Sequence, residues 1–153
     1  MDENQKLERS MQHVWKYFEL HAQQRMTVFN FFLAISGLVA AGIGVSLQQG
    51  SKFSVFASFL GAFLSLISFL FWKLDARISA MIKRAELALC HIEKSGLIQE
   101  AAIFSSDDSV VRNKGFLSIW TYGKCFRISF FTVGFIGIML TIAPYILEMS
   151  SKA

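Results

Sequence analysis

The sequence predicts an all-α membrane protein with three transmembrane helices, the first two of which form a long antiparallel hairpin that extends into the cytoplasm. Apolar residues make up 54% of the 153 residues, and sixteen residues are Phe, which is too apolar for an ordinary soluble domain of this size. Three runs of twenty residues, 28–47, 53–72 and 128–147, contain no Asp, Glu, Lys, Arg or His. At ~1.5 Å per residue each run can cross a ~30 Å hydrocarbon layer. The alternative, a buried soluble helix hairpin, fits poorly with three such runs in one short chain.

These runs divide the chain into seven segments. They are a cytoplasmic amphipathic helix (1–27), transmembrane helix 1 (28–47), an outer turn (48–52), transmembrane helix 2 (53–72), a cytoplasmic helical segment (73–127), transmembrane helix 3 (128–147) and an outer tail (148–153). The turn is short enough to make the first two helices antiparallel neighbours. No helix breaker follows Trp72 until Ser95-Gly96, so we expect the second helix to continue to that point.

The distribution of Lys and Arg predicts the orientation. Four bases precede the first span and nine lie between residues 73 and 127, whereas the outer turn and the tail carry one each. Under the positive-inside rule the amino terminus and the central segment are cytoplasmic and the carboxyl terminus is outside. The net charge of +4 suits contact with anionic lipid headgroups, and it is too small to predict direct binding of nucleic acid.

Apolar residues continue at coiled-coil spacing beyond the inner end of each hairpin helix. In the second helix they are Leu74, Ile78, Met81, Ala85, Ala88 and Ile92, and in the first they are Leu7, Met11, Val14 and Phe18. We therefore expect the two extensions to pack together. Further on, the sequence predicts a short helix at 97–104, a loop at 105–109, a turn at 113–115, and Trp120 and Tyr122 as interfacial anchors.

Two charges lie just beyond the inner ends of the first two spans. If the outer turn centres near Gly50, Arg25 and Asp75 lie at equal depth and face each other. They either form an ion pair that satisfies both charges, or Arg25 reaches lipid phosphate and Asp75 reaches water independently. The sequence leaves both interpretations open.

Small residues recur at close spacing on the first two spans, as they do where helices approach closely in lipid. The predicted helix contacts are Gly37, Ala41, Gly44, Gly61 and Ser65. One row can serve the hairpin itself, which leaves another for the third span or for a second copy of the chain. We therefore expect the protein to form a homo-oligomer.

The sequence predicts no catalytic, cofactor-binding or metal-binding residues. His13, His21 and His91 are not grouped with Cys or acidic residues at the spacing of metal ligands, and no phosphate-binding glycine motif is present. The charge-free spans argue against a proton-coupled transporter or a charge-lined pore. We therefore expect a protein that is not an enzyme and that works by association, anchoring or permeabilisation in the membrane.

The run Trp15-x-Tyr-Phe-x-x-His-Ala-x-Gln-Arg25, followed by Phe29-Asn-Phe-Phe32 and the first span, resembles small membrane proteins encoded in bacterial anti-phage loci. The run is most similar to two groups of these proteins, the transmembrane effectors beside retron reverse transcriptases and the SLATT-type effectors of nucleotide-signalling systems. The resemblance implies a toxic effector that oligomerises and permeabilises or depolarises the inner membrane, which causes abortive infection. It also implies a cytoplasmic regulatory partner, either a reverse transcriptase with its nucleic acid or a nucleotide-signalling component. The residues expected to contact that partner are Trp15, Tyr17, Phe18, His21 and Gln24.

A second function remains open on the same residues. The chain could be a non-toxic membrane scaffold or subunit that anchors a cytoplasmic partner. In that case the cytoplasmic part of the hairpin carries the function, and any spans of matching length would serve.

Overall fold

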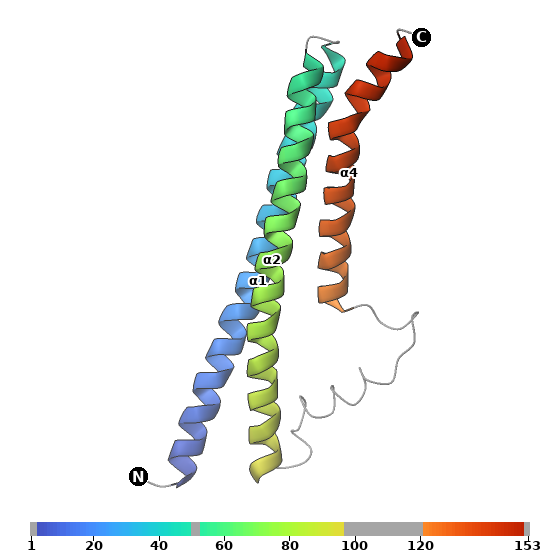
Figure 1. The fold of residues 1–153 in the computed structure, drawn as a ribbon. Coiled ribbons are helices and arrows are strands. Elements are labelled where there is room, and N and C mark those ends of the chain that lie inside the picture. The colour runs from blue at the N-terminus through green and yellow to red at the C-terminus, as the bar shows by residue number, and fades with distance from the viewer. Residues whose placement is uncertain (1–2, 50–52, 97–120, 152–153) are drawn as a thin grey trace. The chain divides into compact units, whose positions relative to one another are not determined.

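The computed structural model describes residues 3–49, 53–96 and 121–151, which form three α-helices. They are α1 (Glu3–Gln48), α2 (Ser54–Gly96) and α4 (Tyr122–Ser151), drawn in Figure 1. Within the described ranges, all three are long and apolar enough to cross a membrane. The prediction of an all-helical chain with three long apolar helices is therefore confirmed.

The helix ends follow simple features of the sequence. From residue 3 to residue 36 there is no Gly or Pro, so α1 continues without interruption from its polar first half into the first charge-free run. The second helix ends at the predicted Ser95-Gly96 breaker, as helices commonly do at glycine. The helix α4 begins at Tyr122, six residues before the third charge-free run. The predicted features at 97–104, 105–109 and 113–115, together with Trp120, lie outside the described residues.

The chain divides into two compact units. Unit 1 contains Met1–Met26 and Ala76–Thr121, and unit 2 contains Thr27–Asp75 and Tyr122–Ala153. Both α1 and α2 therefore contribute one part to each unit, whereas α4 belongs to unit 2. The unit boundaries on α1 and α2 lie within three residues of the inner ends of the predicted spans.

Unit 1 is built on an apolar seam along α2. Its buried residues are Ile78, Ser79, Ile82, Ala85 and Leu89. Ile78 and Ala85 are buried as predicted, but Ile82 and Leu89 take the places assigned to Met81 and Ala88, which are half-buried. Ile82 with Leu89 and Met81 with Ala88 both fit a repeat that averages 3.5 residues, so the periodicity alone does not show which of two adjacent residues is buried.

Two further residues of the predicted seams are exposed. Leu74, at the unit 2 end of α2, is 46% exposed, and Met11 on α1 is 42% exposed. Their assignment to the seam was wrong. On α1 the half-buried and buried positions include Leu7, Val14, Phe18 and His21. The predicted row of apolar residues ends at Phe18, and His21 is buried at the next position of the same repeat.

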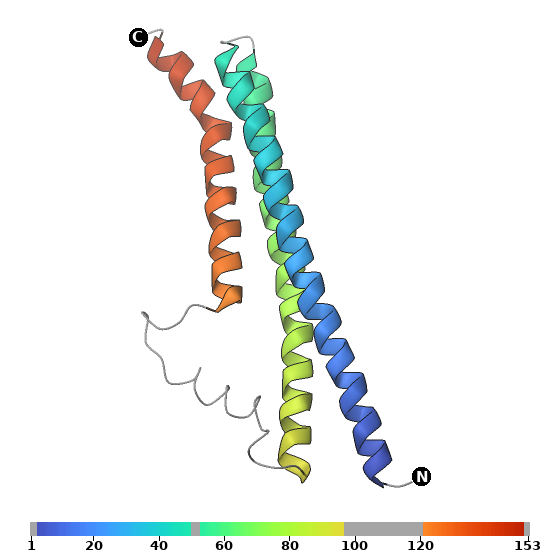
Figure 2. The same ribbon diagram turned by 180° about the vertical axis from the view of Figure 1, so that it is seen from behind.

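Unit 2 packs α4 against α1 and α2, beside which it lies in Figures 1 and 2. Its core contains Phe32, Ile67, Phe126 and Phe130, one or more from each helix. The rings of Phe29 and Phe126 stack with centroids 3.9 Å apart, and Phe32 meets Phe130 edge-on at 4.6 Å. Offset or edge-on aromatic pairs of this kind add to the packing energy. Aromatic contacts therefore join α4 to the hairpin near the beginning of α4.

The outer surface of unit 2 is apolar on all three helices. Exposed large side chains include Leu38 on α1, Phe59 on α2, and Phe131 and Ile146 on α4. Water would penalise a surface of this kind, whereas hydrocarbon does not. The backbone polar groups are satisfied within each helix, which meets the other requirement for a spanning segment.

Candidate functional site

Two glycines, Gly61 and Gly137, mark a close contact between α2 and α4 in unit 2. A methyl group added to Gly61 would lie 2.9 Å from both the carbonyl oxygen of Gly137 and the amide nitrogen of Thr141. One added to Gly137 would lie 2.5 Å from the Oγ of Ser65 and 2.8 Å from the carbonyl oxygen of Gly61. Only glycine allows the two backbones to approach this closely.

Hydroxyl groups cross the same contact. The Oγ of Ser58 donates to the carbonyl oxygen of Thr141 at 3.0 Å, and the Oγ of Ser65 lies 3.0 Å from the carbonyl oxygen of Gly134. Ser65 Oγ also lies 3.3 Å from the carbonyl oxygen of Gly61 in its own helix. In hydrocarbon such interhelical bonds stabilise association by ~0.6 kcal/mol each on average. The contact thus combines close backbone packing with polar attachment.

Two of the predicted helix-contact residues, Gly61 and Ser65, lie in this α2–α4 contact. Their partners Gly134, Gly137 and Thr141 were missed by the sequence reasoning. The signal was available in the third span, where these three residues recur at separations of three and four. That is the same small-residue spacing that marked the first two spans.

The other three predicted contact residues, Gly37, Ala41 and Gly44, are exposed on α1. Nothing lies within 4 Å of a methyl group added at Gly37 or Gly44. At 3.6 residues per turn the row faces away from the buried side of α1, which carries Val39 and Ile43. The row is therefore exposed, with open space beside Gly37 and Gly44, and its role in helix packing stays a prediction.

The residues predicted to contact a partner lie on α1 in unit 1, with different exposures. Trp15 is 47% exposed, Gln24 is exposed, Phe18 is half-buried and His21 is 7% exposed. The Nδ1 of His21 lies 2.7 Å from the carbonyl oxygen of Tyr17. Because a carbonyl oxygen can only accept, the Nδ1–H is the donor of this hydrogen bond. The ring of Tyr17 lies 4.1 Å from that of His21. His21 is thus held inside the unit, which leaves Trp15, Tyr17 and Gln24 more accessible to a partner.

Arg25 and Asp75 belong to different units, Arg25 to unit 1 and Asp75 to unit 2. Arg25 is half-buried and Asp75 is 2% exposed. A carboxylate so well buried is costly unless it has a polar partner, and Asp75 does interact with one or more groups of the protein. The predicted pairing of the two residues stays a prediction.

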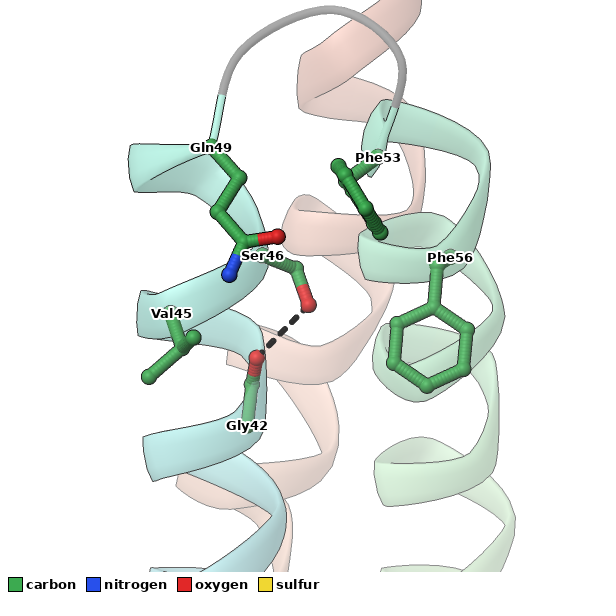
Figure 3. Close-up of a pocket in the computed structure, with 6 residues that line it drawn as sticks. All are labelled: Gly42, Val45, Ser46, Gln49, Phe53 and Phe56. Atoms are coloured by element: carbon green, nitrogen blue, oxygen red, sulfur yellow. Dashed lines mark hydrogen bonds between the residues drawn. The ribbon is translucent and has the colours of Figure 1, made fainter.

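A shallow depression of about 390 Å³ lies between α1 and the residues at the start of α2 (Figure 3). Its lining consists of Gly42, Val45, Ser46, Gln49, Phe53 and Phe56. The Oγ of Ser46 donates to the carbonyl oxygen of Gly42 at 2.7 Å, so its proton is already used within α1. The depression therefore offers mainly hydrocarbon and one carboxamide, which is not a set of groups for acid–base or nucleophilic chemistry.

Among the described residues, no group of three or more His, Cys, Asp or Glu lies close enough together to hold a metal ion.

The chain is similar along its length to CD-NTase-associated protein 19 of Escherichia coli. The two are 55% identical over 150 residues, which cover 97% of this chain and 99% of that protein. No family model matches the chain, and no solved structure matches it. The similarity thus includes all three long helices and is not confined to the first span and its approach.

Proposed function

The chain belongs to the family of CD-NTase-associated protein 19, and from that membership we propose that it is a membrane effector of an anti-phage system based on nucleotide signalling. The name of the relative associates that protein with a CD-NTase. This supports an anti-phage association in general, and it does not single out the retron-associated or the SLATT-type effectors. In the proposed function the trigger reaches the chain through unit 1, from a nucleotide-signalling component.

In this proposal the three apolar helices span the inner membrane, with the amino terminus in the cytoplasm and the carboxyl terminus outside. Copies of the chain associate through the row Gly37, Ala41 and Gly44 on α1. Association on activation permeabilises or depolarises the membrane and arrests the infected cell. The mechanism needs no catalytic residue and no cofactor.

The observation that carries the proposed association of copies is the direction of that row. It consists of small residues at interhelical spacing, and it faces away from the buried side of α1. A lone hairpin or anchor has no need of a second close-packing surface, whereas an oligomer in lipid depends on one.

Induced expression with a membrane-potential dye tests the proposal. Ala41→Leu adds bulk in the middle of the exposed row, and Ala62→Leu adds the same bulk at an exposed position of α2. We expect the wild type and Ala62→Leu to collapse the potential and Ala41→Leu to spare it, at equal amounts of protein in the membrane. Equal depolarisation by all three would contradict association through this row.

The second candidate, a non-toxic scaffold, is favoured by the apolar surface of unit 1. Trp15, Leu20 and Leu87 are large side chains that are exposed there, as expected where a partner docks. Replacing both hairpin spans by an unrelated hairpin of equal length separates the two functions. Retained anti-phage activity would support the scaffold, and lost activity with intact unit 1 would support the effector.

A further inference from the structure

Aromatic rings and a lysine gather on the outside of unit 2, near the beginning of α4. The rings of Trp72 and Phe131 are 5.8 Å apart and join α2 to α4. The Nζ of Lys73 lies 4.9 Å from the centre of the Trp72 ring and 5.7 Å from that of Phe69. Phe131 is 65% exposed and Phe69 is 51% exposed. Trp72 is half-buried and packs against the core, whereas Lys73, Phe69 and Phe131 are exposed beside it, so the group lies at the edge of the core and reaches the surface.

The register of α2 and α4 brings two more bases to this place. The helices are antiparallel, because Ser58 meets Thr141, Ser65 meets Gly134 and Trp72 meets Phe131 along the contact. Lys73 is the residue after Trp72 on α2, and in this register it lies within about one helical turn of Arg127, measured along α4.

The bases on α4 share a face with the exposed ring. Arg127 lies four residues before Phe131, and Lys124 seven residues before it, so all three side chains leave the same side of the helix. The distance from Arg127 to Phe131 along the helix is about 6 Å, which is within reach of an arginine side chain.

In the described part of unit 2, no exposed carboxylate lies beside these bases. Unit 2 contains two acidic residues: Asp75 is buried, and Glu148 follows Arg127 by 21 residues, about 30 Å along α4. Lys73, Lys124 and Arg127 are all exposed, and none of them forms an ion pair with another residue in the described part of the chain. The surface is therefore positive beside exposed aromatic rings.

We infer that Lys73, Lys124 and Arg127, together with the Trp72 and Phe131 rings, bind an anionic phospholipid of the cytoplasmic leaflet, with its phosphate at the bases. The inference rests on the proposed insertion of unit 2 in the membrane. Charge complementarity selects an anionic headgroup, and each base near an anionic membrane surface is worth about a fivefold gain in association. The exposed rings of Phe69 and Phe131 select a lipid over a free phosphate, because they need acyl chains to cover them. Trp at the interface and an ammonium over its ring are both typical of this depth.

The test uses Trp72 as the reporter. The chain has three tryptophans, so Trp15→Phe with Trp120→Phe leaves Trp72 alone. The full chain is reconstituted in phosphatidylcholine vesicles that contain, at equal mole fraction, either brominated phosphatidylglycerol or brominated phosphatidylcholine. Bromine on the acyl chains quenches tryptophan on contact. We expect phosphatidylglycerol to associate at least about fivefold more strongly than phosphatidylcholine, as one base near an anionic surface would give.

Two further variants with the same loss of charge assign the preference to this surface. The test variant carries Lys73→Gln, Lys124→Gln and Arg127→Gln. The control carries Lys6→Gln, Lys83→Gln and Arg84→Gln, which remove three exposed bases from unit 1. We expect the test variant to quench equally with both lipids and the control to keep the preference.

Equal quenching by both lipids before any base is removed, or a preference that survives in the test variant, would overturn the lipid site. Inorganic phosphate should leave the preference unchanged when chloride matches the ionic strength. If the preference for phosphatidylglycerol is lost in phosphate and kept in chloride, the bases bind a free anion, and this result also overturns the inference. Absence of quenching by either lipid would instead contradict the insertion of α2, and so the proposed function itself.

Discussion

The α2–α4 contact leads to a quantitative prediction for Gly137→Ala. The new methyl group would lie 2.8 Å from the carbonyl oxygen of Gly61 and 2.9 Å from the amide nitrogen of Ser65. Both are backbone atoms, which cannot rotate away as a side chain can. To restore ordinary contact the helices must separate by roughly 0.5 Å, and overpacking of this kind costs ~1–3 kcal/mol.

The separation also affects a hydrogen bond. Ser65 Oγ lies 3.0 Å from the carbonyl oxygen of Gly134, and an additional half ångström would take the pair beyond normal hydrogen-bond length. That loss adds ~0.6 kcal/mol. We therefore expect Gly137→Ala to lower the free energy of unfolding by about 2 kcal/mol, a factor of about thirty in the ratio of folded to unfolded protein.

Gly44→Ala is the matched control within one chain, because nothing lies within 4 Å of its added methyl group and alanine favours the helix; an excess of detergent keeps copies from associating through the exposed row. The assay is a titration of the purified chain from mild detergent into SDS, followed by near-ultraviolet circular dichroism. This signal depends on packed aromatic side chains and so reports tertiary structure when the helices themselves persist. Unfolding energies for Gly137→Ala and Gly44→Ala that agree within ~0.5 kcal/mol would refute the close approach of α2 and α4.

Three further predictions use the same titration. Ser65→Ala should cost ~0.6 kcal/mol, whereas Ser68→Ala should be neutral or stabilising, because the Ser68 hydroxyl is buried without a hydrogen-bond partner among the described residues; a larger cost at Ser68 would show that its hydroxyl is satisfied. Phe126→Ala should cost ~0.5–1.5 kcal/mol beyond the area it exposes, through loss of its stacked ring contact, and an unchanged near-ultraviolet spectrum would contradict that contact. The double variant Arg25→Asp with Asp75→Arg should recover stability that each single reversal removes if the two residues pair, and additive losses would favour independent contacts with lipid and water.

The sequence anticipated the helices better than their contacts. Three charge-free runs were enough to identify three long apolar helices, because length and hydropathy are properties of each segment alone. The Ser95-Gly96 breaker likewise marks the end of α2 without reference to any neighbour. The predicted seams on α1 and α2 are wrong at Met11 and Leu74, which are exposed. There two adjacent sets of positions fit one period equally well, and the packed partner decides between them.

In unit 2 the sequence by itself determined which residues are small and apolar, and it determined that such residues recur at interhelical spacing. Only the tertiary structure decided that Gly61 and Ser65 meet α4 while Gly37, Ala41 and Gly44 face outward. The physical reason is that every face of a lipid-compatible helix is apolar, so hydrophobic periodicity does not mark the packed side as it does in water. What marks it is the fit of one backbone against another, and that depends on two helices at once.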